Sequence, residues 1–105
     1  MRHYDLLSPA QDDILGLLGH LSDYSDKASD RFIDALTDAF EQLSVFPNMG
    51  RERGDLSENL RSFPIKRLKV TVFYYVTPED GDAVLVARVL RQERDVDPSL
   101  FPDRS

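Results

Sequence analysis

The residues KVTVFYYV at positions 69–76 are almost entirely β-branched or aromatic, which is typical of a central strand with both faces covered. The turn residues PEDGD follow at 78–82, and AVLVARVLR at 83–91 then predicts a second strand. The two strands are therefore expected to form an antiparallel hairpin. Strict alternation places Val84, Val86, Arg88 and Leu90 on one face, and Ala83, Leu85, Ala87, Val89 and Arg91 on the other.

Upstream of this hairpin, the segment Leu60–Lys66 predicts a further strand. Pro64 cannot donate a hydrogen bond to a neighbouring strand, so its presence there indicates a sheet edge or a bulge. The preceding residues 51–59, RERGDLSEN, are polar and predict a loop. Before them, Pro47 and Gly50 predict a turn that ends a helical segment.

Two helices are predicted in the first half of the chain. The residues SPAQ at 8–11 combine a capping serine and glutamine with a proline at the first helical position, and this helix is expected to reach Leu21. After a break at 22–25, a second helix is predicted over Asp26–Val45, with an apolar stripe opposite a face rich in aspartate. The first residues, 2–7, predict a short extended segment.

The predicted order of elements is β-α-α-β-β-β, with two helices placed before the hairpin-linked strands. This order predicts an α+β fold in which an N-terminal helical hairpin packs on a mainly antiparallel sheet. A chain of 105 residues has the usual size of one domain, so residues 1–105 are expected to form a single domain. The strand order beyond the last hairpin is left open by the sequence.

Composition excludes several classes of function. The chain has no cysteine and only two histidines, which removes thiolate catalysis and Cys-type zinc sites, and no metal site or cofactor is predicted. A net charge of −6 argues against non-specific DNA binding. No apolar run is long enough to cross a membrane and no signal peptide is evident, so a cytoplasmic location is expected.

Basic residues gather in the second half of the chain, whereas the first half is acidic. Arg88 shares its predicted face with apolar residues, so its charge needs a partner. That partner is either an anionic group of another molecule or one of the chain's own acids, such as Glu93 or a helix aspartate. Leu100 and Phe101 in the tail are expected to be exposed unless the tail folds back. The residues predicted to bind a partner are Arg61, Lys69, Arg88, Arg91, Arg94, Leu100 and Phe101.

Five blocks of the sequence together resemble the ParE/RelE superfamily of toxins from type II toxin–antitoxin systems. They occur in the family's order over nearly the whole chain, and the last block is most similar to the ParE branch. These blocks are YDLLSPA at 4–10, FPNMGR at 46–51, LRSFP at 60–64, VFYYV at 72–76 and ARVLRQERD at 87–95.

The resemblance implies a toxin that a ParD-like antitoxin neutralises in a hetero-oligomer. ParD-like antitoxins dimerise and bind operator DNA through a ribbon-helix-helix domain, so DNA binding by the toxin itself is not expected. For the ParE branch, the resemblance implies inhibition of DNA gyrase by protein binding. Two alternatives remain: a RelE-like endoribonuclease that cuts mRNA on the ribosome, and a non-toxic relative that only binds the antitoxin and regulates its operon.

One position favours binding over cutting. Arg91 stands where this superfamily often carries a histidine, and no tyrosine, lysine or histidine follows Asp95. An arginine stays charged and is a poor proton shuttle, so the acid–base pair needed for RNA cleavage is missing. The chain is therefore predicted to be a non-enzymatic, ParE-like toxin with no catalytic residue.

Overall fold

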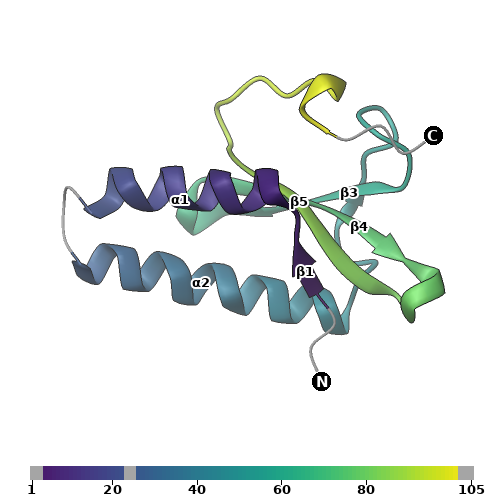
Figure 1. Cartoon of the computed structure of the whole chain (residues 1–105), viewed down its shortest axis with the longest axis horizontal. Helices are drawn as coiled ribbons and strands as arrows, with labels where there is room; N and C mark the ends of the chain where they lie inside the picture. The colour runs from purple at the N-terminus through teal and green to yellow at the C-terminus, as the bar shows by residue number, and fades with distance from the viewer. Residues whose placement is uncertain (1–3, 23–25, 102–105) are drawn as a thin grey trace.

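A computed structural model describes residues 4–22 and 26–101. Two helices cover one face of a five-stranded sheet, and the C-terminal tail crosses the opposite face (Figure 1). This arrangement confirms the predicted α+β fold with a helical hairpin packed on the sheet. The predicted break between the helices falls mainly on residues 23–25, which lie outside the described residues.

The elements follow the predicted order with one addition. The short strand β2 lies within the segment 51–59, for which the sequence predicted only a loop. It is two residues long and exposed, so no apolar alternation marks it in the sequence. The bounds are β1 (Tyr4–Leu6), α1 (Ser8–Ser22), α2 (Asp26–Val45), β2 (Arg51–Glu52), β3 (Leu60–Ile65), β4 (Val70–Thr77) and β5 (Ala83–Arg91), with 3₁₀ turns at Lys66–Leu68, Pro78–Asp80 and Pro98–Leu100.

The strands lie in the order β1-β5-β4-β3-β2. Strand β1 runs parallel to β5, with Tyr4 beside Val84, and the other neighbours are antiparallel. The last strand of the chain therefore occupies an interior place in the sheet, between the first strand and β4.

A β-bulge interrupts the pairing of β4 with β5. Tyr74 lies opposite Val86 and Phe73 opposite Arg88, so Ala87 is the extra residue. The predicted alternation of 83–91 is therefore right as far as Ala87 and wrong beyond it. Val89 packs with Val84 and Val86 on the helix side, whereas Leu90 packs with Leu85 and Ala87 on the other side.

Apolar side chains form a core on each face of the sheet. The larger core lies between the sheet and the two helices and includes Phe32, Leu36, Phe40, Leu43, Val70, Val72, Tyr74, Val84, Val86 and Val89. The smaller core lies under the tail and consists of Leu56, Leu60, Phe73, Tyr75, Ala87, Leu90 and Phe101. Because both faces are covered, residues 72–75 of the predicted central strand are buried, whereas Lys69 at its start is exposed.

Candidate binding surface

The bulge directs Arg88 toward the first turns of α1. Its Nε donates to Asp13 Oδ2 at 2.7 Å and its Nη2 donates to Asp13 Oδ1 at 2.8 Å, which is a two-pronged ion pair. The backbone N–H of Val89 also donates to Asp13 Oδ2, at 3.0 Å. The third guanidinium nitrogen, Nη1, donates to the carbonyl of Leu100 at 3.1 Å. Arg88 therefore joins α1, β5 and the tail.

This contact decides between the two partners that the sequence left open for Arg88. The partner is a helix aspartate, Asp13, and the side chains of the pair are only 15% and 11% exposed. The hydrogen bonds that Arg88 donates to Asp13 raise the pKa of Arg88 above its usual value, so the guanidinium remains charged. Within the chain, Arg88 has a structural role, and its role in binding a partner stays a prediction.

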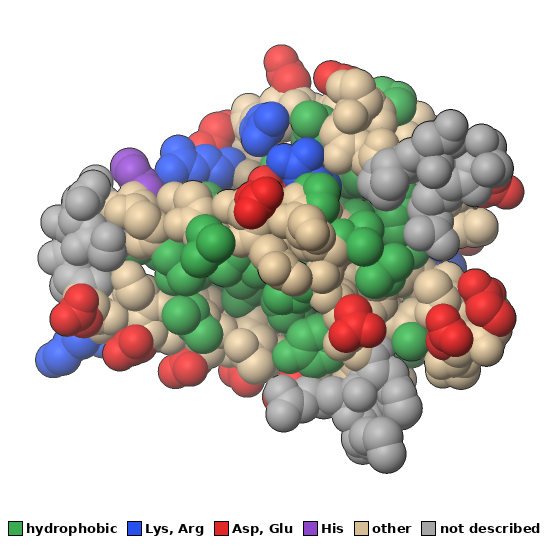
Figure 2. Space-filling view, viewed as in Figure 1, with side chains coloured by type: hydrophobic (Ala, Val, Ile, Leu, Met, Phe, Trp, Pro, Cys, Tyr) green, Lys and Arg blue, Asp and Glu red, His purple; other side chains and the backbone are tan. Residues whose placement is uncertain are grey.

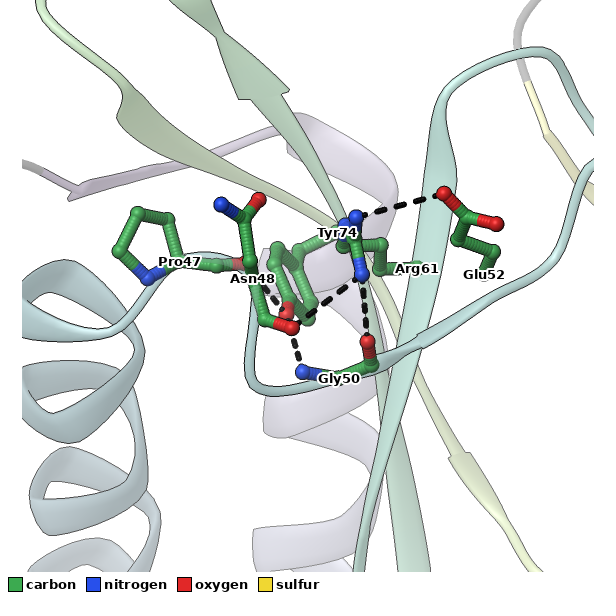
Figure 3. A network of polar contacts seen from close by, with 6 residues as sticks. All are labelled: Pro47, Asn48, Gly50, Glu52, Arg61 and Tyr74. Atoms are coloured by element: carbon green, nitrogen blue, oxygen red, sulfur yellow. Dashed lines mark hydrogen bonds and ion pairs between the residues drawn. The ribbon is translucent and has the colours of Figure 1, made fainter.

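Arg61 is also engaged within the chain. It lies on β3 and donates through Nη1 to the carbonyls of Gly50, at 2.7 Å, and Asn48, at 3.3 Å (Figure 3). Its Nη2 approaches Glu52 at 3.5 Å. Arg61 thus holds the turn after α2 against the sheet, and its contacts are two backbone carbonyls and one exposed carboxylate.

Tyr74 fastens the same turn from the core side. Its hydroxyl donates to the carbonyl of Pro47 at 2.8 Å and accepts from the N–H of Gly50 at 2.9 Å (Figure 3). The backbone of Gly50 passes so close that an added Cβ would lie 2.5 Å from the Tyr74 oxygen and 2.8 Å from the carbonyl oxygen of Ser62. Only glycine fits at this position.

Burial raises the pKa of Tyr74 above the ordinary tyrosine value of about 10, against the opposing effect of the Gly50 hydrogen bond. The unfolded chain therefore loses this proton at lower pH than the folded protein. The contribution of this raised pKa to the free energy of unfolding is fully present below about pH 10, and it is lost as the pH rises through the pKa of Tyr74 in the folded protein. We expect Tyr74→Phe to lower the free energy of unfolding by about 1–3 kcal/mol at pH 8, because two buried hydrogen bonds are lost.

Above pH 10, the difference in free energy of unfolding between wild type and Tyr74→Phe is expected to narrow, because the variant has no ionisable group at position 74. Urea denaturation followed by circular dichroism at pH 8 and at about pH 10.5 measures both values. A gap that widens with pH would contradict this account of the Tyr74 environment.

The remaining predicted arginines, Arg91 and Arg94, are exposed at the end of β5 and in the segment after it. Within the described residues, neither side chain has a hydrogen-bond or ion-pair partner. Together with Arg51 and Arg53 they border a hollow of about 530 Å³ on the sheet face opposite the helices. Arg51 and Arg53 were not predicted from the sequence as binding residues, although their basic side chains at the start of 51–59 were the available signal.

Lys69 lies next to Arg91, at the pocket between the helices and the sheet. Its backbone adopts a left-handed conformation, with φ of 57°, and its carbonyl accepts from the N–H of Gln92 at 2.9 Å. Lys69 and Arg91 line one pocket of about 230 Å³ between the helices and the sheet, together with His20 and Glu93. Arg91 thus shares one pocket with Lys69 and another hollow with Arg94. Arg61 and Arg88 line neither of them.

The tail folds back on the sheet. Phe101 is only 8% exposed, its ring centroid lies 5.2 Å from that of Phe73, and Leu100 is half-buried beside the same core. The exposed large apolar side chains are instead found on α1, on α2 and in the turn after α2: Leu15, Ile33, Val45, Phe46 and Met49. Hydrophobic side chains are visible along the seam between the two helices (Figure 2).

The charges are separated on the surface. Basic side chains gather above α1, whereas acidic side chains line the free edge of α2 (Figure 2). The described part of the chain contains no group of three or more His, Asp or Glu side chains placed to hold a metal ion. No helix among residues 4–22 and 26–101 is long and apolar enough to cross a membrane.

The fold is shared with a solved structure, and a family model matches the sequence. The structure titled "Chromosomal ParDE TA system from P. aeruginosa" superposes with a TM-score of 0.71 over 89% of this chain and 98% of that chain, at 16% identity. The family described as "ParE toxin of type II toxin-antitoxin system, parDE" matches residues 4–96. The chain therefore belongs to this family of ParE toxins.

A curated relative agrees with this assignment. Toxin ParE3 of Caulobacter vibrioides is 34% identical over 64 residues, which cover 61% of this chain and 59% of the relative. The match thus spans less than two thirds of the relative's length. The resemblance found in the sequence is confirmed at the level of the family and its ParE branch.

Proposed function

We propose that this toxin inhibits DNA gyrase by binding it and that a ParD-like antitoxin neutralises it. The observation that carries the proposal is the pair of exposed, unengaged arginines, Arg91 and Arg94, at the rim of the sheet. Guanidinium groups of this kind bind carboxylates and phosphates with directed hydrogen bonds. They are always charged, so they are suited to holding a partner and poorly suited to moving protons.

A nuclease would need a general base and a general acid beside the phosphate. In the described residues, the hollow next to Arg91 and Arg94 is lined by one carboxylate, Asp95, and by no histidine, lysine or tyrosine. This composition supports a protein that binds its target without cleaving a substrate.

The RelE-like alternative has one observation in its favour, because His20, Lys69 and Glu93 meet in the neighbouring pocket. Arg91 also lines that pocket, and the remaining lining residues are apolar: Leu17, Leu21, Phe32, Leu68 and Val70. An apolar pocket with a polar rim fits an apolar anchor side chain better than a ribose phosphate. This pocket therefore agrees better with protein binding than with RNA cleavage.

The helical hairpin is the proposed contact for the antitoxin. Leu15 on α1 and Ile33 on α2 are 67% and 44% exposed, and both helices carry acidic side chains around them. An antitoxin segment with apolar anchors flanked by lysine or arginine would complement this surface. The basic residues Arg61, Lys69, Arg88, Arg91 and Arg94, with Leu100 and Phe101 in the tail, are proposed to serve antitoxin or target binding. Operator DNA would be reached only through the antitoxin, in the cytoplasm.

We expect the purified toxin to inhibit DNA supercoiling by gyrase, and Arg91→Ala with Arg94→Ala to weaken the inhibition at least about tenfold. Both side chains are exposed, so the double variant is expected to remain folded. Arg31→Ala on α2 is the matched control, because it removes an exposed arginine that does not line the hollow bordered by Arg91 and Arg94. Full inhibition by the double variant would refute the role of these arginines.

Expression of the toxin in cells distinguishes the alternatives. Cleaved transcripts after brief expression, with supercoiling unaffected, would establish the nuclease. Normal growth when the toxin is expressed without its antitoxin would establish a non-toxic relative. Either outcome would refute the proposed action on gyrase.

A further inference from the structure

We infer that the hollow on the sheet face opposite the helices is a binding groove for an acidic peptide segment of a partner protein. The inference rests on the proposed function in assigning Arg91 and Arg94 to partner binding, and it adds the chemistry of the bound segment. It stands or fails independently of whether gyrase is the target.

The groove has two basic walls on opposite sides of one floor. Arg51 and Arg53, on β2 and just after it, form one wall, and Arg91 and Arg94, at the end of β5 and after it, form the other. The floor between them consists of residues from β3 and β4: Ser62, Pro64, Thr71 and Phe73. The sheet order places β3 and β4 between β2 and β5, so a ligand that lies across the floor meets guanidinium groups on both sides.

Three of the four arginines are available to a ligand. Arg51, Arg91 and Arg94 are exposed, and among the described residues their side chains form no hydrogen bond or ion pair, although Asp55 and Asp97 lie near enough to feel the charges of Arg51 and Arg94. Arg53 differs, because it pairs with Asp55 at 3.1 Å and lies over the ring of Phe73, at 5.9 Å from its centroid. Arg53 is therefore held in place as part of the wall, whereas the other three can form ion pairs with a bound segment.

The acidic side chains of the tail form no hydrogen-bonded ion pair with these arginines. Asp97 accepts hydrogen bonds from the hydroxyl and the N–H of Ser99, and these bonds, with a smaller effect of the Arg94 charge, lower its pKa below the usual aspartate value. Asp95 lines the groove but forms no ion pair with Arg91 or Arg94. Positive charge thus remains concentrated in the groove although the whole chain carries a net charge of −6.

The floor favours a peptide over a nucleic acid. Single-stranded nucleic acids are usually held by exposed aromatic rings on which the bases stack. The aromatic residue that lines this groove, Phe73, is only 2% exposed and is covered by Arg53 and Phe101. The net negative charge of the protein also opposes a polyanion as long as a nucleic acid strand. The carboxylates of a short acidic segment can form ion pairs with the arginines of both walls, and they need no aromatic surface for stacking.

The test measures binding of a short fluorescein-labelled peptide of alternating glutamate and serine by fluorescence anisotropy. The full-length toxin is expected to bind this peptide, to bind more weakly as salt rises, and to ignore the same peptide with glutamine in place of glutamate. Arg51→Gln combined with Arg94→Gln, one from each wall, is expected to weaken binding by roughly tenfold.

Arg31→Gln on α2 is the matched control and is expected to bind like wild type, because it removes the same charge outside the groove. Circular dichroism checks that each variant is folded. The inference is overturned if wild type does not bind the glutamate peptide, if the two-wall variant binds it as wild type does, or if labelled oligothymidylate binds more tightly than the peptide. These readouts do not involve gyrase, so they separate this inference from the proposed function.

Discussion

Replacing Arg88 with alanine is expected to lower the free energy of unfolding by about 3 kcal/mol. The substitution leaves the carboxylate of Asp13 in a site where its side chain is only 11% exposed, with the N–H of Val89 as its remaining partner. Removing one member of a buried ion pair is costly, because the other charge stays desolvated without compensation. The carbonyl of Leu100 loses its donor as well, so the tail is expected to detach more readily.

Urea denaturation followed by circular dichroism measures this loss. Arg91→Ala is the matched control, since it removes an exposed arginine from the same strand, and its effect should stay within about 0.5 kcal/mol. A double-mutant cycle with Asp13→Asn separates the coupling energy of the pair from the single effects. If Arg88→Ala proved no more harmful than Arg91→Ala, the proposed structural role of the pair would be wrong.

The second large effect is expected for Gly50→Ala, which should lower the free energy of unfolding by about 3 kcal/mol. A Cβ at this position would lie 2.5 Å from the Tyr74 hydroxyl oxygen and 2.8 Å from the Ser62 carbonyl oxygen. These clashes can be relieved only if the backbone at Ser62 or the buried ring of Tyr74 moves, and overpacking of this kind costs about 1–3 kcal/mol. The hydrogen bonds of Tyr74 to the turn would be distorted at the same time, which adds to the cost.

Gly54→Ala is the matched control for this substitution, because nothing lies within 4 Å of the added Cβ. Thermal unfolding should place Gly54→Ala close to wild type and Gly50→Ala well below it. Equal melting temperatures for the two variants would show that the turn after α2 can move away from Tyr74.

Local patterns predicted most of the fold. Both helices and the hairpin of β4 with β5 were found because their periodicity and turn residues act over a few neighbours. The parallel pairing of β1 with β5 was left open, since it joins distant parts of the chain and has no local signature. The bulge at Ala87 was missed for a similar reason, because strict alternation is the default that a sequence offers.

The candidate site was predicted less completely. Arg91, Arg94 and Lys69 were expected on the surface, and all three are exposed there. Arg61 and Arg88 have their partners inside the chain, and Asp13 lies 75 residues from Arg88. Such a pairing depends on tertiary packing and not on spacing in the sequence.

The interior place of β5 has a consequence for how the toxin is made. During synthesis the first strand and α1 leave the ribosome early, but the strand that connects them to β4 is made last. Pairings between distant segments form late, because they must overcome the entropy of closing a long loop. A nascent chain that stops before Ala83 lacks the strand that joins the two halves of the sheet. The complete sheet can therefore form only after β5 has been synthesised.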